Sequence, residues 1–216
     1  MKFVYPHNLR RHFFTKLKIS FLLFIATTVM TAPNTSVTYR IDASKSSFYV
    51  KAFIGGLFSA FGHDHNIQVR DFTGEAVFST EKPDQSSLWI TIKAASLAVT
   101  DKVSASDRTQ IEQTMRDEIL ETGKYPEITF RSTRVSANKI NDSEYDVRID
   151  GNLALHGVTR ATTINARVTA NGNDLQTRGS LPLRQTDFHI APASVAVGTI
   201  KVKDELKLTF DIVAHK

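Results

Sequence analysis

Apolar and polar residues alternate with a period of two along most of the chain after residue 32. Side chains of a β-strand point alternately to opposite faces, so each alternating segment predicts a strand with one apolar face. The apolar positions of the clearest segments are Phe48, Val50, Ala52 and Ile54; Leu88, Ile90, Ile92 and Ala94; Ile128 and Phe130; Val147, Ile149, Gly151, Leu153 and Leu155; and Ile200, Val202, Leu206, Leu208, Phe210 and Ile212. Turn residues such as Pro83-Asp84 and Asn171-Gly172 separate them, and the pattern predicts a single all-β domain.

One stretch in the middle of the chain departs from this alternation. Its apolar residues recur every four positions, at Ile111, Met115 and Ile119, which is the spacing of one helix face. We therefore predict one short amphipathic helix over residues 107–122. Such a helix either closes a barrel mouth as a lid or plug or simply packs on the sheet, and the pattern does not decide between these two roles.

Residues at both ends of this stretch suit helix termination. Asp107 is followed three residues later by Gln110, an arrangement that resembles a capping box. Gly123 suits a left-handed residue after the last helical turn. We expect Asp107 to cap the N-terminus of the helix and Gly123 to end it.

The first 32 residues differ in composition from the rest of the chain. They contain five basic residues and no acidic residue, and they include the apolar run 19–26. A basic start before a short apolar run is typical of a secretory signal peptide, and the run is shorter than the about 20 residues of a transmembrane helix. We predict a signal peptide at residues 1–32, a mature domain at residues 33–216, and a periplasmic or secreted location in a bacterial envelope. An uncleaved signal anchor is the alternative.

Charge and cysteine content exclude several classes of function. The chain has 27 Lys and Arg against 22 Asp and Glu, and the five basic residues of the leader account for the whole excess. No basic cluster remains that would bind nucleic acid, so no nucleic-acid partner is expected. The lack of cysteine excludes disulfides, thiol nucleophiles and thiolate metal ligands.

The histidines carry the main alternative chemistry. His63 and His65 lie two residues apart, so they would share one side of a strand, and His156 and His189 could join them in space to hold Zn²⁺ or Cu²⁺. A serine beside this block would be needed for hydrolysis, but no Gly-x-Ser-x-Gly nucleophile elbow is present. Because neither pattern is specific, we assign no metal ligand and no catalytic residue.

Several blocks of sequence occur in an order that resembles the YceI-like family of lipid- and polyisoprenoid-binding proteins. They are residues 39–42, 58–74, 125–130, 151–157 and 198–214. The resemblance covers roughly residues 39 to 215. It implies one antiparallel, lipocalin-like β-barrel with a short helix, which holds an isoprenoid-tailed or fatty amphiphile in an apolar channel. The Gly-His-Asp-His block at residues 62–65 departs from the plainer family pattern.

In such a barrel the apolar half of each strand faces the channel, and polar residues near a mouth select the headgroup. We expect His63 or His65 to hydrogen-bond the headgroup, and Asp64 to fix an imidazole tautomer or to face solvent. An apolar inward face is also what a dry core shows. The predicted ligand-binding residues are Phe48, Val50, Ile54, Phe58, Phe61, His63, His65, Ile90, Ile92, Phe130, Ile149, Leu153, Leu208 and Phe210.

These observations predict an exported binding protein, not an enzyme, for an isoprenoid, quinone or fatty acyl small molecule, with no cofactor and no bound metal. Two alternatives stand beside it. One is a histidine-based metal-binding protein or hydrolase at residues 62–65, and the other is a structural barrel that binds nothing. The sequence leaves transient membrane contact and dimer formation open.

Overall fold

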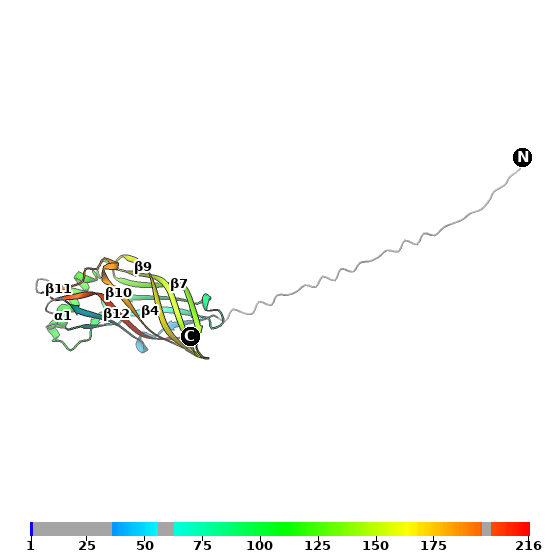
Figure 1. Cartoon of the computed structure of the whole chain (residues 1–216), viewed down its shortest axis with the longest axis horizontal. Coiled ribbons are helices and arrows are strands. Elements are labelled where there is room, and N and C mark those ends of the chain that lie inside the picture. The colour runs from blue at the N-terminus through cyan, green and yellow to red at the C-terminus, as the bar shows by residue number, and fades with distance from the viewer. Residues whose placement is uncertain (2–35, 56–62, 196–199) are drawn as a thin grey trace. The chain divides into compact units, whose positions relative to one another are not determined.

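Long antiparallel strands dominate the computed structural model (Figure 1), which describes Met1 and residues 36–55, 63–195 and 200–216. The predicted signal peptide therefore lies outside the described residues, apart from Met1. No helix in the described ranges is both long enough and apolar enough to cross a membrane.

The strands differ in length, and the longest lie in the C-terminal half. They are β1 (Val37–Ile41), β2 (Ser47–Gly55), β3 (His65–Val69), β4 (Phe72–Phe78), β5 (Ser87–Lys93), β6 (Leu97–Val99), β7 (Glu127–Lys139), β8 (Glu144–Leu155), β9 (Val158–Asn171), β10 (Asp174–Arg184), β11 (Ser194–Val195) and β12 (Ile200–His215). The helical segments are α1 (Ala105–Thr114) and the short turns η1 (Ala43–Lys45), η3 (Pro83–Gln85), η4 (Ala94–Ser96), η5 (Met115–Ile119) and η6 (Gln185–Phe188).

Eight strands close into a barrel. Hydrogen-bonded neighbours follow the order β1-β4-β5-β7-β8-β9-β10-β12, and β12 then pairs back with β1, where Ala214 lies opposite Ile41. These pairings are antiparallel. Closing a sheet on itself removes its unpaired edges. The predicted all-β, lipocalin-like barrel with one short helix is confirmed.

Three neighbouring strands of the wall are interrupted at a similar level. Turn η1 separates β1 from β2, residues 70–71 separate β3 from β4, and turn η4 separates β5 from β6. Beyond these breaks the wall continues in the order β12-β2-β3-β6. In the described residues β6 has no strand on its other side, and its Val99 N–H donates instead to the Glu112 carboxylate of α1 at 2.9 Å. Helix α1 therefore supplies an acceptor to the edge of β6 that has no neighbouring strand in the described residues.

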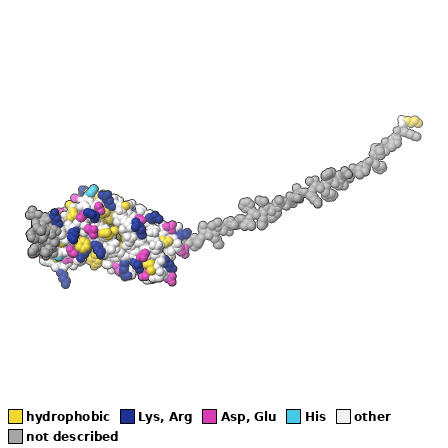
Figure 2. All heavy atoms as spheres, viewed as in Figure 1, with side chains coloured by type: hydrophobic (Ala, Val, Ile, Leu, Met, Phe, Trp, Pro, Cys, Tyr) yellow, Lys and Arg dark blue, Asp and Glu magenta, His cyan; other side chains and the backbone are white. Residues whose placement is uncertain are grey.

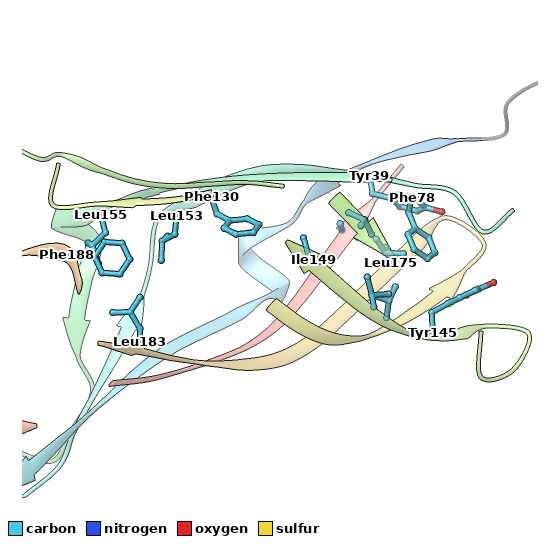
Figure 3. Close-up of a cluster of buried hydrophobic side chains, with 14 of the residues drawn as sticks. Tyr39, Phe78, Phe130, Tyr145, Ile149, Leu153, Leu155, Leu175, Leu183 and Phe188 are labelled. Carbon is cyan, nitrogen blue, oxygen red and sulfur yellow. The ribbon is translucent and has the colours of Figure 1, made fainter. Parts of the chain in front are cut away.

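The interior holds the apolar half of each alternation, as the sequence predicts. In β8 the buried side chains are Tyr145, Val147, Ile149, Leu153 and Leu155, while Asp146, Arg148 and Asn152 between them are exposed. Figure 3 shows Phe130, Leu153, Ile149 and Leu175 in the space between the strands.

The outer surface carries a balanced set of charges. Figure 2 shows basic and acidic side chains interspersed over the face in view. On β8, β9 and β10, Arg148, Arg167 and Arg178 pair with Asp150, Asp146 and Asp211 at 2.8–2.9 Å. The barrel thus lacks a single-sign patch along these strands, which agrees with the balanced charge of the sequence.

The helix begins earlier and ends earlier than predicted. Helix α1 spans Ala105–Thr114 and continues as a π-helical turn over Met115–Ile119. Ser104 is the N-cap, because its Oγ accepts a hydrogen bond from the Asp107 N–H at 3.1 Å. The prediction that Asp107 caps the helix is therefore wrong; Asp107 lies in the first turn, where a carboxylate favours the positive end of the helix dipole.

The end of this helical segment also differs from the prediction. Gly123 is not in the left-handed region, and Glu121 takes that conformation instead, with φ of 44°. Its carboxylate Oε2 lies 2.7 Å from His156 Nε2. Glu121 therefore takes the left-handed conformation that the sequence predicts for Gly123, and its side chain contacts His156.

Ser104→Ala is expected to destabilise the domain by about 1 kcal/mol, because the first turn of α1 loses its capping acceptor. The measurement is urea unfolding monitored by far-ultraviolet circular dichroism. Ser106→Ala is the control, since Ser106 lies inside the same helix and is exposed. Equal stability of the Ser104→Ala and Ser106→Ala variants would contradict the assignment of the cap.

Candidate ligand-binding cavity

A cavity of about 680 Å³ lies inside the barrel. Its wall is mostly apolar and combines side chains of the strands with side chains of the helix. Cavities of about 300–1,000 Å³ with apolar walls and a few polar groups are typical of small-molecule sites. The interior is therefore a candidate binding site as well as a core.

The structure brings most of the predicted site residues to this wall. Of the predicted residues, Phe58 and Phe61 lie outside the described part of the chain. The others line the cavity: Phe48, Val50, Ile54, His63, His65, Ile90, Ile92, Phe130, Ile149, Leu153, Leu208 and Phe210. Their position follows from strand alternation, while contact with a ligand stays a prediction.

The helix contributes to the wall as well. Ile111 of α1 and Met115 and Ile119 of η5 line the cavity, and Met115 is 8% exposed. The four-residue apolar stripe thus faces the barrel interior. Figure 1 shows α1 at the end of the barrel away from the C-terminus.

Sequence reasoning missed further wall residues on one long strand and on two short ones. Leu181 and Leu183 of β10, Ile67 of β3 and Leu97 of β6 line the cavity. Alternation in residues 175–183 is a signal that could have identified the first two. The segments 65–69 and 97–99 are too short for periodicity to identify their inward face.

Polar side chains gather at one part of the cavity wall. His63 and His65 both line the cavity, and their ring centroids lie 4.7 Å apart at an interplanar angle of 70°. His65 Nδ1 lies 2.8 Å from Asp101 Oδ2. Asp101 also accepts hydrogen bonds on Oδ1 from the Asn66 backbone N–H at 3.0 Å and from Asn66 Nδ2 at 3.1 Å. The sequence prediction missed Asp101, which is 36 residues from His65.

Asp101, not Asp64, orients a histidine. Asp64 accepts a hydrogen bond from the Ile54 backbone N–H at 3.0 Å and pairs with Lys51 at 3.2 Å. These contacts tie the chain before β3 to β2, and they lower the pKa of Asp64 below its ordinary value. Of the two roles expected for Asp64, fixing an imidazole tautomer is wrong, because the carboxylate accepts from β2 donors. Its side chain is 39% exposed, in line with the alternative that it faces solvent.

The Asp101 carboxylate is held in its ionised form. Burial acts to raise its pKa, but the hydrogen bonds from the Asn66 backbone, from His65 and from the Asn66 side chain outweigh this effect, so its pKa lies below the ordinary value. An ionised carboxylate only accepts hydrogen bonds. A neutral His65 therefore carries its proton on Nδ1, which leaves Nε2 as an acceptor.

His156 and His189 do not join this cluster. His156 Nε2 lies 2.7 Å from Glu121 Oε2, its Nδ1 lies 3.2 Å from the Phe188 carbonyl oxygen, and its ring packs on Tyr125 with centroids 4.5 Å apart. His156 thus links the end of η5, the β8–β9 turn and η6. The group of possible metal ligands around His63 and His65 is completed by Asp101, so the possibility that His156 and His189 join them is not realised in the described residues.

The family model for the YceI-like domain matches residues 39–214. The chain belongs to the YceI-like family. The match covers all of the described barrel except its outermost residues, so the cavity is part of the family domain. The resemblance seen in the sequence is confirmed.

Bacterial proteins of the family align with this YceI-like chain at moderate identity. A UPF0312 protein of Pseudomonas paraeruginosa is 34% identical over 137 residues, which cover 59% of this chain and 66% of that protein. Two relatives from Pseudomonas putida are matched over 64% of their length. Protein YceI of Escherichia coli is 31% identical over 144 residues, covering 61% of this chain and 68% of the relative.

Solved structures share the fold at lower identity. Burkholderia cenocepacia BcnA superposes with a TM-score of 0.62 at 21% identity, covering 80% of this chain and 98% of BcnA. A domain from Saccharophagus degradans, described as polyisoprenoid binding and implicated in plant cell wall breakdown, gives 0.55 at 14% identity, covering 82% of this chain and 97% of that domain. At these identities the likeness establishes the fold only.

Proposed function

We propose that this YceI-like barrel binds a small amphiphile by enclosing its apolar tail, and that the ligand is an isoprenoid, a quinone or a fatty acyl compound. The observation that carries the proposal is the apolar cavity of about 680 Å³ inside the barrel. The description of the Saccharophagus degradans domain as polyisoprenoid binding supports it by analogy.

Burial of the tail supplies the driving force. Each buried methylene contributes about 0.8 kcal/mol, so one five-carbon unit contributes about 4 kcal/mol before the costs of association. Wall residues such as Phe48, Ile90 and Leu208 offer no hydrogen bond, so the wall recognises shape and length rather than polar groups.

The headgroup is expected near His63 and His65. The neutral tautomer set by Asp101 makes His65 Nε2 an acceptor for a hydroxyl group, and exposed His63 can donate or accept. We therefore infer that a hydroxyl or carbonyl headgroup lies at this part of the wall.

We infer binding rather than catalysis, since the apolar cavity and the structural neighbour described as polyisoprenoid binding both favour a bound small molecule.

The test is native mass spectrometry of protein purified from its own envelope, followed by solvent extraction and lipid analysis. A co-purifying compound with an isoprenoid or acyl tail, released by unfolding, is the expected result. Purified protein is also titrated with a polyprenol, an isoprenoid quinone and a fatty acid. Protein that carries no lipid and takes up none of these three probes would show that the cavity is a dry interior.

Export through the N-terminal segment is a separate part of the proposal. The basic start and short apolar run of residues 1–32 support it. Full-length protein is expected in the soluble fraction of the bacterial envelope, shortened at its N-terminus, and protein lacking residues 1–32 is expected in the cytoplasm. A full-length species that resists extraction from the membrane would indicate an uncleaved anchor instead.

A further inference from the structure

Two imidazoles of the cavity wall converge with a carboxylate beside them. One donor atom from each of His63, His65 and Asp101 lies within 4.8 Å of the other two. The three residues come from the chain before β3, the first position of β3 and the residues after β6. The cluster is therefore assembled by the fold and not by a local motif.

The distances suit a metal ion. Zinc binds imidazole nitrogen at about 2.0–2.1 Å and carboxylate oxygen at about 2.0–2.2 Å, so two such ligands at bond angles of 90–109° lie about 2.8–3.5 Å apart. His65 Nδ1 and Asp101 Oδ2 are already 2.8 Å apart. His63 is exposed, so its side chain can turn toward these two atoms without disturbing packed neighbours.

Two of the three donors are held in place before any ion binds. The Asp101 side chain is 8% exposed, and the two hydrogen bonds from Asn66 fix its Oδ1, which leaves Oδ2 directed at His65. His65 is 18% exposed and pairs with Ala52 in the β2–β3 ladder. Arg108 Nη2 donates a hydrogen bond to the Asp101 backbone carbonyl at 2.8 Å, which holds the backbone at this position.

We propose that His63, His65 and Asp101 bind a divalent transition-metal ion, which replaces the proton shared by His65 Nδ1 and Asp101 Oδ2. The Nδ1 proton leaves to solvent while Nε2 takes up a proton, so the imidazole stays neutral and its Nδ1 lone pair forms the bond to the metal. Imidazole with carboxylate suits Zn²⁺, Ni²⁺ and Cu²⁺. Because His63 and His65 line the cavity, the remaining positions of the ion are open to water and to a polar group inside the cavity.

The first test titrates metal-free, lipid-free protein with ZnCl₂ by calorimetry. One ion per chain is expected for the native protein. The His63→Ala, His65→Ala and Asp101→Asn variants are each expected to bind Zn²⁺ at least about a hundredfold more weakly. Mutation of a residue that only hydrogen-bonds a metal ligand already lowers metal affinity by about 10–100-fold. His189→Asn is the control: it removes another exposed imidazole, and asparagine tolerates the left-handed φ of 58° at that position.

A second measurement identifies the donor atoms. The electron paramagnetic resonance spectrum of the Cu²⁺ complex is expected to show nitrogen couplings from two imidazoles in the native protein and from one in the His63→Ala variant. No stoichiometric Zn²⁺ binding by native protein, or unchanged affinity in His63→Ala, would overturn the proposal. His63 is exposed, so this variant keeps the packing of the barrel.

The metal site and the lipid cavity are tested separately. Uptake of an isoprenoid hydrocarbon without a headgroup, which needs only the tail cavity, is measured on native protein and on the same His63→Ala protein. Retained uptake of this hydrocarbon without any Zn²⁺ binding in the native protein would reject the metal site alone. Zn²⁺ binding without uptake of any lipid probe would reject the amphiphile proposal alone.

Discussion

Ala52→Trp is expected to abolish uptake of a long-tailed ligand while the barrel stays folded. Ala52 is 7% exposed, lies between Val50 and Ile54 on β2, and lines the cavity opposite Leu206 of β12. An indole at this position projects into the space that a tail would occupy. Displacing as few as four methylenes costs about 3 kcal/mol, which is about a hundredfold in affinity.

The matched control is Ala161→Trp. Ala161 is exposed on β9, opposite Asn152, so its side chain points away from the cavity. Polyprenol affinity and melting temperature are measured for both variants and for the native protein. Lost affinity with little change in melting is the result expected of an open channel. A melting drop from overpacking, worth about 1–3 kcal/mol, together with no uptake by any of the three proteins, would instead indicate a dry core.

Gly157→Ala is expected to destabilise the barrel by about 2–5 kcal/mol, the largest loss of stability that we predict. Gly157 forms the β8–β9 turn with His156, and both residues have positive φ, at 75° and 51°. A left-handed alanine costs about 1–2 kcal/mol. Its Cβ would also lie 2.6 Å from the Tyr125 ring. Overpacking of this kind costs about 1–3 kcal/mol more.

Gly172→Ala separates the two costs. Gly172 lies in the β9–β10 turn with φ of 59°, but nothing lies within 4 Å of the Cβ position. Its substitution is expected to cost only the left-handed strain of about 1–2 kcal/mol. Urea unfolding of both variants gives the two free energies. Equal losses would show that the Tyr125 contact contributes nothing to the requirement for glycine at position 157.

The strands and their inward faces were predictable because the signal is local. A residue's side of a strand follows from whether its position is odd or even, so Phe48, Ile90 and Leu208 could be assigned to the interior without knowing their neighbours. The helical stripe of Ile111, Met115 and Ile119 follows from the 3.6-residue period in the same way. The Asn171-Gly172 turn likewise reflects the backbone freedom of one residue.

Cap residues were less predictable, since they depend on tertiary contacts. Ser104 and Asp107 are both common N-cap residue types. Which of them caps the helix depends on where the helix begins, and in the structure it begins at Ala105. At the other end, Glu121 adopts the left-handed conformation while its carboxylate binds His156, which is 35 residues away. Sequence near Gly123 contains no sign of that partner.

By itself the sequence determined the all-β class, the inward half of each strand and the presence of a histidine pair near the start of β3, because each depends on neighbouring residues. Only the tertiary structure decided that the sheet closes, through Ile41 and Ala214, and that an apolar space remains inside. It also brought Asp101 to His65 and left Asp64 facing β2. Closure and this pairing join residues far apart in the chain, and their approach depends on the register of all the strands between them.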